Sequence, residues 1–566
     1  MNEIVYLIFR QVRTPALVLL TAYSVAIFGM IMMPGVDEEG SPAKMTIFQA
    51  FYWVSYTATT IGYGEVPFAF SEAQRMWVAF SIYYTVPSWF YAIGKLIALM
   101  QDATFQHALA EMRFAQKVGR LDSRFVIICG FGEAGKRLVR RLIDANFHCI
   151  VIDKDPGSIN RMALDASLHS VFAIAGDASD VELLTRAGIR SPHCRAVVAI
   201  TDREEVNIKV ALAAKLLSSN HQHFRIICRT YTRRGSNNAQ SLDVDTIINT
   251  NRIFAERLTI GLRRPSIAAL LNRLYAEPGE AYELPLQPPD GRWIICGYDS
   301  LGKTLKRFLE YEGVDSLIID PNAPEEPGFL RGVGSEAVTL RAADIGRAQA
   351  IVAAENSDSD NLSIAMTAKA MHPSLFVVGK QNRSSNEKLF DLAGFDRVMA
   401  EAELIATQIF PRIARPLLSR FITLLRHQDE AFGKALLARI EALAGDHNPH
   451  HYILRINDKH APAVIQELAS GNLLRLQHMW MLPGEPDTAN DALPLYMKRG
   501  KQEILLPNLA TTLQKDDAIL IVYHKPIVER RLRYACYDEG ELYFAAHGKE
   551  RPRSWLFNYL RNKFDT

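Results

Sequence analysis

Two long apolar stretches lie near the start of the chain. Residues 15–33 contain no charged side chain over 19 positions, and residues 76–100 contain a single one, Lys95. A stretch of this length can cross the apolar interior of a bilayer as a helix, and such stretches are rare in soluble domains. The pattern therefore predicts two membrane-spanning helices, one over each stretch.

The charged residues around these stretches indicate their orientation. Arg10 and Arg13 precede the first stretch, and basic residues follow the second at positions 113, 117, 120 and 124. The segment between the stretches begins with three acidic residues, at 37–39. Because basic flanks stay in the cytoplasm, we expect a multi-pass protein of the cell inner membrane with both termini cytoplasmic.

A third apolar segment lies between the two stretches, at residues 46–58 (TIFQAFYWVSYTA). With 13 residues it is too short to span a bilayer as a helix, but it suits a helix that enters the membrane and leaves on the same side. We therefore expect a re-entrant helix at residues 46–58.

This segment leads directly into a glycine-rich motif. The motif reads Thr60-Ile61-Gly62-Tyr63-Gly64. Glycine permits backbone conformations that other residues avoid, and carbonyl oxygens that point inward can replace the water shell of a cation. Irregular backbone at membrane depth is tolerated where it lines an aqueous path. We expect these five residues to form an ion selectivity filter, with Tyr63 packed outward against Tyr52 and Trp53.

The second apolar stretch contains two residues that disturb a helix, Pro87 and Gly94. Proline removes a backbone hydrogen bond, and glycine loosens a helix. Either residue could provide a gating hinge. Alternatively, both serve only to pack the membrane helices together, because glycine and proline are common in such helices.

The pattern changes after a polar linker at residues 101–123. Apolar runs typical of strands now alternate with helical segments, which indicates parallel sheets. Residues 124–129 form the first run, a Gly-x-Gly-x-x-Gly motif at 130–135 follows it, and Asp153 ends the next strand. This order of strand, glycine motif, helix and acidic residue is typical of a dinucleotide-binding fold.

The glycine motif would let a pyrophosphate approach the backbone at a helix N-terminus. A free carboxylate at Asp153 disfavours a 2′-phosphate, so NAD or ADP is expected rather than NADP. Asp177 ends a later strand and could contact the ribose or the adenine, or serve only in a turn. A Rossmann-like scaffold with an empty cleft is the alternative. The candidate nucleotide-binding residues are Gly130, Phe131, Gly132, Glu133, Ala134, Gly135, Asp153, Lys154, Asp177 and Ala178.

The strand and glycine pattern recurs later in the chain. Cys129-Gly130 aligns with Cys296-Gly297 and Asp153 with Asp320, at the same offset of 167 residues. A repeat of this length indicates a duplicated domain rather than a solenoid. In the second copy Asp299 replaces the middle glycine, and its carboxylate would repel a pyrophosphate. We therefore expect that the second cleft does not hold a dinucleotide in the usual pose.

These patterns together predict the fold class. We expect an α-helical two-transmembrane pore domain with a re-entrant pore helix, two α/β Rossmann-like domains and a small α+β C-terminal lobe. The expected boundaries are 1–100 for the pore domain, 101–123 for a linker, 124–277 for the first Rossmann-like domain with crossover helices, 278–291 for a second linker, 292–430 for the second Rossmann-like domain with its crossover helices, 431–545 for the C-terminal lobe and 546–566 for a basic tail.

Composition excludes several classes of protein. The 64 Lys and Arg residues nearly balance the 62 Asp and Glu residues, which argues against binding to nucleic acid. The 6 cysteines are scattered singly, which argues against disulfides and a zinc site. Oxygen-rich segments at 177–180 and 356–361, and three histidines at 447, 450 and 451, are interpreted as polar loops, so the residues of any metal site are unknown.

The filter motif and the duplicated Rossmann-like domains resemble prokaryotic potassium channels with RCK domains, the regulators of K⁺ conductance. The motif at 60–64 is similar to the TVGYG filter of that family, and Glu65 stands where the family usually has Asp. The resemblance covers nearly the whole chain. It implies a homotetramer in the lipid bilayer with a gating ring of eight RCK domains. It also implies K⁺ as the permeant ion, NAD or ADP as a gating ligand, Ca²⁺ as a further candidate ligand, and no enzymatic activity.

Three alternatives stay open at this point. A non-selective cation channel would have a similar layout, although the intact filter motif argues against it. A membrane-tethered NAD-dependent oxidoreductase would explain the glycine motif but not the filter, and the sequence offers no convincing catalytic constellation. A regulatory subunit of a potassium transporter would lack a filter of its own.

Overall fold

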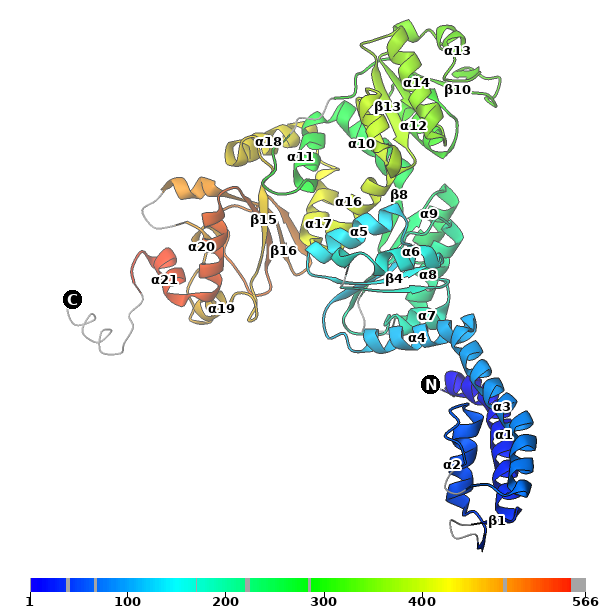
Figure 1. The fold of residues 1–566 in the computed structure, drawn as a ribbon. Helices are drawn as coiled ribbons and strands as arrows, with labels where there is room; N and C mark the ends of the chain where they lie inside the picture. The colour runs from blue at the N-terminus through cyan, green and yellow to red at the C-terminus, as the bar shows by residue number, and fades with distance from the viewer. Residues whose placement is uncertain are drawn as a thin grey trace, which may run out of the picture. The chain divides into compact units, whose positions relative to one another are not determined.

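A computed structural model describes residues 2–36, 41–65, 69–168, 170–218, 224–282, 287–481 and 486–550. Figure 1 gives the course of the chain. The chain divides into two compact units, one of Met1–Leu121 with Arg186–Gly188, and one of Asp122–Thr185 with Ile189–Thr566. The acidic positions 37–39 and most of the predicted basic tail, 551–566, lie outside the described residues.

The first unit is largely helical. Its elements are α1 (Asn2–Met32), the short antiparallel strands β1 (Gly35–Val36) and β2 (Pro42–Ala43), α2 (Ile47–Ala58), α3 (Glu72–Gln101) and α4 (Ala103–Gly119). Helix α2 begins at a capping box, in which the Thr46 hydroxyl accepts from Gln49 N–H and the Gln49 side chain accepts from Thr46 N–H. Helix α4, capped by Asp102, occupies most of the segment predicted as a linker at 101–123.

Helices α1 and α3 pack closely where α1 has a glycine. The indole N–H of Trp77 donates to the carbonyl of Ala26 at 3.0 Å. A Cβ atom at Gly29 would lie 2.0 Å from the Trp77 ring, so only glycine leaves room for the indole. Met30 and Trp53 are buried in the core of this unit, which joins α1 to α2.

Helix α1 contains a candidate membrane span at Val12–Met32. Within the described residues it is the single helix long and apolar enough by composition to cross a bilayer. The second predicted span lies inside α3, and its passage through a membrane stays a prediction.

The second unit contains two six-stranded parallel sheets. The strands of the first are β3 (Phe125–Cys129), β4 (His148–Asp153), β5 (Val171–Ala175), β6 (Cys194–Ala199), β7 (Arg225–Thr230) and β8 (Thr246–Asn249). The intervening helices are α5 (Glu133–Asp144), α6 (Pro156–Ala163), α7 (Val181–Arg186), α8 (Glu204–Leu217) and α9 (Arg233–Ser241). The strand order is β5-β4-β3-β6-β7-β8, and every residue of the central β3 is buried. Burial on both faces explains why this strand is a continuous apolar run.

The second sheet repeats the first. Its strands are β9 (Trp293–Cys296), β10 (Ser316–Asp320), β11 (Phe329–Arg331), β12 (Ala350–Ala353), β13 (Phe376–Gln381) and β14 (Arg397–Ala400). Its helices are α12 (Ser300–Tyr311), α13 (Ala337–Ala342), α14 (Asp358–Met371) and α15 (Glu387–Leu392). The strand order β11-β10-β9-β12-β13-β14 is equivalent to that of the first sheet, as a domain duplication requires.

Side chains at equivalent places make equivalent bonds in the two copies. The buried Asn207 amide bonds Thr201 N–H and the carbonyls of Thr201 and Arg229. The buried Asn361 amide does the same with Glu355 and Lys380. Each asparagine thus joins the carboxyl ends of two neighbouring strands.

Helix pairs follow each sheet. These are α10 (Thr250–Arg263) with α11 (Pro265–Tyr275), and α16 (Glu401–Ala414) with α17 (Pro416–Leu425). In both pairs the second helix starts with proline, which cannot continue the first helix but suits the first position of a new one.

A smaller lobe completes the second unit. It contains α18 (Glu430–Ala444), β15 (His450–Arg455), α19 (Pro462–Ala469), β16 (Ala492–Arg499), β17 (Gln502–Leu505), β18 (Ala518–Tyr523), α20 (Pro526–Tyr537) and α21 (Glu539–His547). Its four strands form an antiparallel sheet in the order β15-β18-β16-β17. An α+β lobe was predicted in this region.

Candidate functional sites

The glycine-rich segment after α2 has an alternating backbone. Thr60, Gly62 and Gly64 have positive φ angles of 63°, 66° and 93°, whereas Ile61 and Tyr63 do not. In an extended strand successive carbonyls point to opposite sides. Alternation of the sign of φ rotates every second peptide, so the carbonyl oxygens of the segment can face one side together. This is the arrangement that a ring of cation-binding carbonyls needs.

Tyr56 holds this segment from α2. Its carbonyl accepts from the N–H groups of Ile61 and Gly62 at 2.9 and 3.2 Å, and its hydroxyl donates to the Gly64 carbonyl at 2.7 Å. The Tyr63 ring meets the Tyr56 ring edge-on, with centroids 5.7 Å apart. Within this chain Tyr56 is the aromatic neighbour of Tyr63, and Trp53 is buried in the core. The packing of Tyr63 against Tyr52 and Trp53 stays a prediction.

Glu65 follows the segment and is fixed by three donors. The Arg75 guanidinium donates to both carboxylate oxygens, at 2.8 and 3.1 Å, and Phe70 N–H donates at 2.9 Å. A two-pronged guanidinium contact restricts the orientation of a carboxylate more than a single hydrogen bond does. The acidic group at the end of the motif is thus held in one position.

The outer surface of the segment is uncovered in the single chain. The Ile61 and Tyr63 side chains are 60% and 65% exposed, and nothing lies within 4 Å of a Cβ atom built at Gly62 or Gly64. Large apolar side chains in this state indicate a surface that other molecules cover.

Both predicted hinge residues lie inside α3. The helix runs from Glu72 to Gln101 without interruption at Pro87 or Gly94. A Cβ atom at Gly94 would meet nothing within 4 Å, so close packing does not require glycine there. Whether either residue bends during gating stays a prediction.

The predicted nucleotide-binding residues surround a cavity in the second unit. A cavity of about 590 Å³ opens at the carboxyl ends of β3, β4 and β6. All of the predicted nucleotide-binding residues line it: Gly130, Phe131, Gly132, Glu133, Ala134, Gly135, Asp153, Lys154, Asp177 and Ala178. A volume of this size suits a small-molecule ligand.

The three glycines of the turn have different roles. Gly130 has a φ of 110°, and a Cβ atom there would lie 2.9 Å from Thr201 N. A Cβ atom at Gly135 would lie 2.3 Å from the Gly130 carbonyl oxygen, so this glycine lets α5 approach β3. Nothing lies within 4 Å of a Cβ atom at Gly132. The open space at Gly132, at the N-terminus of α5, is where a phosphate could approach the backbone.

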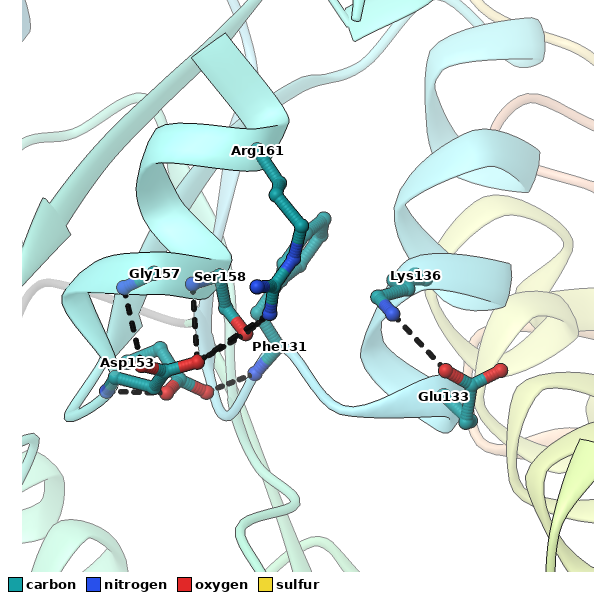
Figure 2. Close-up of polar contacts among 8 residues, drawn as sticks. Phe131, Glu133, Lys136, Asp153, Gly157, Ser158 and Arg161 are labelled. Carbon is teal, nitrogen blue, oxygen red and sulfur yellow. Dashed lines mark hydrogen bonds and ion pairs between the residues drawn. The ribbon is translucent and has the colours of Figure 1, made fainter. Parts of the chain in front are cut away.

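Asp153 is oriented by backbone donors. Its carboxylate accepts from Phe131 N–H at 2.6 Å, as Figure 2 shows. It also accepts from Asp155 N–H at 2.8 Å. Asp155 in turn caps α6 by accepting from Gly157 and Ser158 N–H. The acidic side chain at the end of β4 therefore has a defined position at the edge of the cavity, which fits a role in binding a ribose.

Sequence reasoning missed most of the far wall of the cavity. Thr201, Asp202 and Arg203 of this wall follow β6, and Arg229 lies in β7. The rest belongs to the second copy, namely Gln381, Asn382, Ser384 and Ala400, Glu401, Ala402, Glu403 and Ile405. Thr201 and Asp202 could be assigned to a strand end from the pattern, but no local signal in the sequence links α16 to the first cleft.

A partly buried ion pair joins the two copies at this wall. Arg229 Nη2 lies 2.6 Å from Glu401 Oε1, which also accepts from the Thr250 hydroxyl at 2.7 Å. Burial alone would raise the pKa of Glu401, but the charge of Arg229 and the bond from Thr250 bring it below its ordinary value. Glu401 is therefore a charged group on the cavity wall at neutral pH.

The second cleft is acidic. Asp320 accepts from Tyr298 N–H at 2.8 Å and from Asn322 N–H at 2.7 Å, which matches the bonds of Asp153. Asp299 accepts from Asn356. Burial, followed by the charges of Asp320 and Asp299, raises the pKa of Glu355. A negative field of this kind opposes the binding of a pyrophosphate.

The structure offers no metal centre among the residues it describes. No three His, Cys, Asp or Glu side chains of the described ranges gather into a group that could hold a metal ion. Asp177 accepts from Ser179 N–H and hydroxyl, and Ser357 caps α14. Burial, together with the positive charge of Arg415, lowers the pKa of His451 to about 3.

Comparison with known families matches both units. A family model described as ion channel matches residues 16–102, and a model described as TrkA-N domain matches residues 126–250 and 293–401. The first match contains α2 and the glycine-rich segment, and the second covers both parallel sheets.

Related proteins were found by sequence and by structure. Potassium channel protein 1 of Methanocaldococcus jannaschii is 25% identical over 174 residues, which is 31% of this chain and 50% of that protein. The voltage-gated potassium channel Kch of Escherichia coli is 24% identical over 33% of this chain and 43% of that protein. The solved GsuK channel bound to NAD is 14% identical, with a TM-score of 0.43, over 94% of this chain and 99% of that chain. The chain thus spans about half the length, or less, of these curated relatives.

Proposed function

Because this chain joins an ion-channel domain to two TrkA-N domains, as potassium channels with RCK domains do, we propose that it is a subunit of a potassium-selective channel. The filter is Thr60–Gly64, and K⁺ is the permeant ion. The protein lies in the cell inner membrane with both termini in the cytoplasm. Its cytosolic RCK domains sense a nucleotide, NAD or ADP, and thereby open or close the pore.

The alternating backbone of the filter carries the proposal. Positive φ angles at Thr60, Gly62 and Gly64 allow the carbonyl oxygens to face one side, where they can replace the water around a cation. The pair of Glu65 and Arg75 fixes the end of the segment. A backbone of this kind serves ion coordination better than it serves either an oxidoreductase or a regulatory subunit without a pore.

The uncovered side of the filter supports a homotetramer. One chain supplies one strand of a filter, and four strands are needed to surround the ion. Ile61 and Tyr63 would be covered by neighbouring subunits in such an assembly. Four chains with two RCK domains each give a gating ring of eight.

The first cleft supports nucleotide sensing. Its cavity has an open approach at Gly132 and a carboxylate held in place at Asp153. The free carboxylate favours a ribose with an unmodified 2′-hydroxyl. Ca²⁺ is a further candidate ligand that can be tested together with the nucleotides.

Planar bilayer recordings of the purified full-length protein under a K⁺ gradient test the proposal. NAD, ADP and Ca²⁺ are added in turn to the cytosolic side. We expect current that reverses near the K⁺ equilibrium potential and responds to a nucleotide, and we expect Asp153→Ala to remove the response. Reversal near zero would show a non-selective channel, and a selective current indifferent to nucleotides would overturn the sensing role alone.

A further inference from the structure

Arg137 is a cation poised at the phosphate side of the first cleft. It stands on α5, just after the glycine turn, and its side chain lines the cavity and is 33% exposed. Side chains on a helix lean toward its N-terminus. Arg137 therefore extends toward the same end of α5 at which Gly132 leaves space.

Two carboxylates of the second RCK domain hold Arg137 in this structure. Its Nη1 donates to Glu403 on α16 at 3.2 Å, and its Nη2 donates to Glu387 on α15 at 3.3 Å. The other oxygen of Glu403 accepts from Arg141, one turn further along α5, and from the Thr407 hydroxyl. Glu403 thus bridges Arg137 and Arg141 of α5 to the second domain.

We propose that the phosphates of the bound nucleotide compete with Glu403 and Glu387 for Arg137. Binding then exchanges an ion pair between the two RCK domains for one between α5 and the ligand. This inference rests on the proposed nucleotide site. It implies that nucleotide binding weakens the contact of α5 with α15 and α16.

The surrounding charges favour such an exchange. Burial alone would raise the pKa of Glu403, but Arg141, Thr407 and Arg137 bring it below its ordinary value, so it is charged when a nucleotide arrives. Glu133 is engaged by Lys136 at 2.9 Å, and Glu401 by Arg229. Arg137 is a cation of the cavity lining whose partners a phosphate can displace while Glu403 keeps Arg141.

The exchange also links the cleft to the rest of the ring. A ligand changes a conformational equilibrium only through a difference in its affinity for the two states. If Arg137 binds phosphate only after it leaves Glu403, the nucleotide binds more tightly to the state with the loosened contact. By reciprocity, weakening that contact must tighten nucleotide binding.

Titration of ADP into the detergent-solubilised full-length protein tests this directly by calorimetry. We expect Arg137→Ala to weaken ADP binding about tenfold, as for loss of a charged hydrogen bond. We expect Glu403→Gln to tighten it about threefold, because the competing carboxylate at the half-exposed pair is removed.

Arg141→Ala is the matched control. Arg141 contacts the same Glu403 but does not line the cavity. We expect this variant to bind ADP as well as the wild-type protein, or more tightly. Weaker binding by Glu403→Gln, or equal losses in Arg137→Ala and Arg141→Ala, would overturn the exchange. Absence of binding of both NAD and ADP to the wild-type protein would instead remove the proposed nucleotide site, and the exchange with it.

Discussion

At the scale of single residues, two glycines of the same turn have different roles, one in helix packing and one in ligand binding. Gly135 is needed so that α5 can approach β3, because a Cβ atom there would lie 2.3 Å from a backbone oxygen. Gly132 has an ordinary backbone conformation and open space around it. Gly135 is therefore required for the packing of the fold, whereas Gly132 leaves space for the ligand.

This difference predicts opposite effects of two alanine substitutions. Gly135→Ala should destabilise the second unit by about 1–3 kcal/mol, as overpacking does. Gly132→Ala should leave stability unchanged but weaken ADP binding, because its methyl group enters the space left for phosphate. Thermal unfolding and ADP titration of both variants measure the two effects. A normal melting temperature for Gly135→Ala would contradict the packing role.

The sequence could predict the residues of the first cleft that follow the glycine pattern. Gly130 to Gly135 and Asp153 belong to one local unit of strand, turn, helix and strand, and the chain itself sets their spacing. Glu401 and Glu403 belong to the far wall only because the second domain packs against the first. That contact depends on the tertiary structure, so no periodicity in the sequence records it.

At the scale of elements, the packing of α1 against α3 depends on one small residue. Gly29 leaves space for the Trp77 indole, which bonds the Ala26 carbonyl. Close approach of helix backbones at small residues is a general means of packing in membranes. In α3, by contrast, Gly94 has no neighbour that requires a small residue.

Two further substitutions separate packing from gating. Gly29→Val should displace Trp77 and lower the apparent melting temperature of the solubilised protein. Gly94→Ala should leave the melting temperature unchanged, and, if Gly94 is the gating hinge, it should alter the open probability in bilayers. A melting temperature unchanged by Gly29→Val would show that the contact of α1 with α3 is looser than the structure indicates.

The elements were also easier to predict than their ends. Apolar runs and glycine turns predicted the strands on either side of each glycine turn, β3 with β4 and β9 with β10, whereas β8, β11, β13 and β14 were not predicted. The segment at 101–123 was interpreted as a polar, mildly helical linker. It forms α4, because most of its residues are good helix formers and Asp102 caps its start.

At the scale of the whole molecule, duplication has left two similar domains with different charges. Both keep the strand order, the asparagine that joins the ends of two strands (Asn207 or Asn361), and the acidic residue that accepts from the turn. Only the first keeps a glycine where the second has Asp299. The copies therefore share a framework, while the electrostatics of their clefts differ.

The two acidic residues should accordingly differ in function. Asp153→Ala should abolish the nucleotide response of the channel, whereas Asp320→Ala should leave it intact, because Asp299 and Glu355 make the second cleft repel phosphate. Bilayer recordings of the two variants with ADP make the comparison. Loss of the response in both would mean that the second cleft also takes part in binding.

The polar contacts at the far wall of the first cleft also form a continuous connection between secondary-structure elements. Asn207 ties the end of β6 to Arg229, Arg229 grips Glu401 at the start of α16, and Glu401 is anchored to Thr250 at the start of α10. Each of these contacts is short and at least partly buried, so a displacement of the cleft wall would be transmitted directly to α10 and α16. The wall with Arg229 and Glu401 would then stay rigid, and the cleft would open or close on the side held by Arg137.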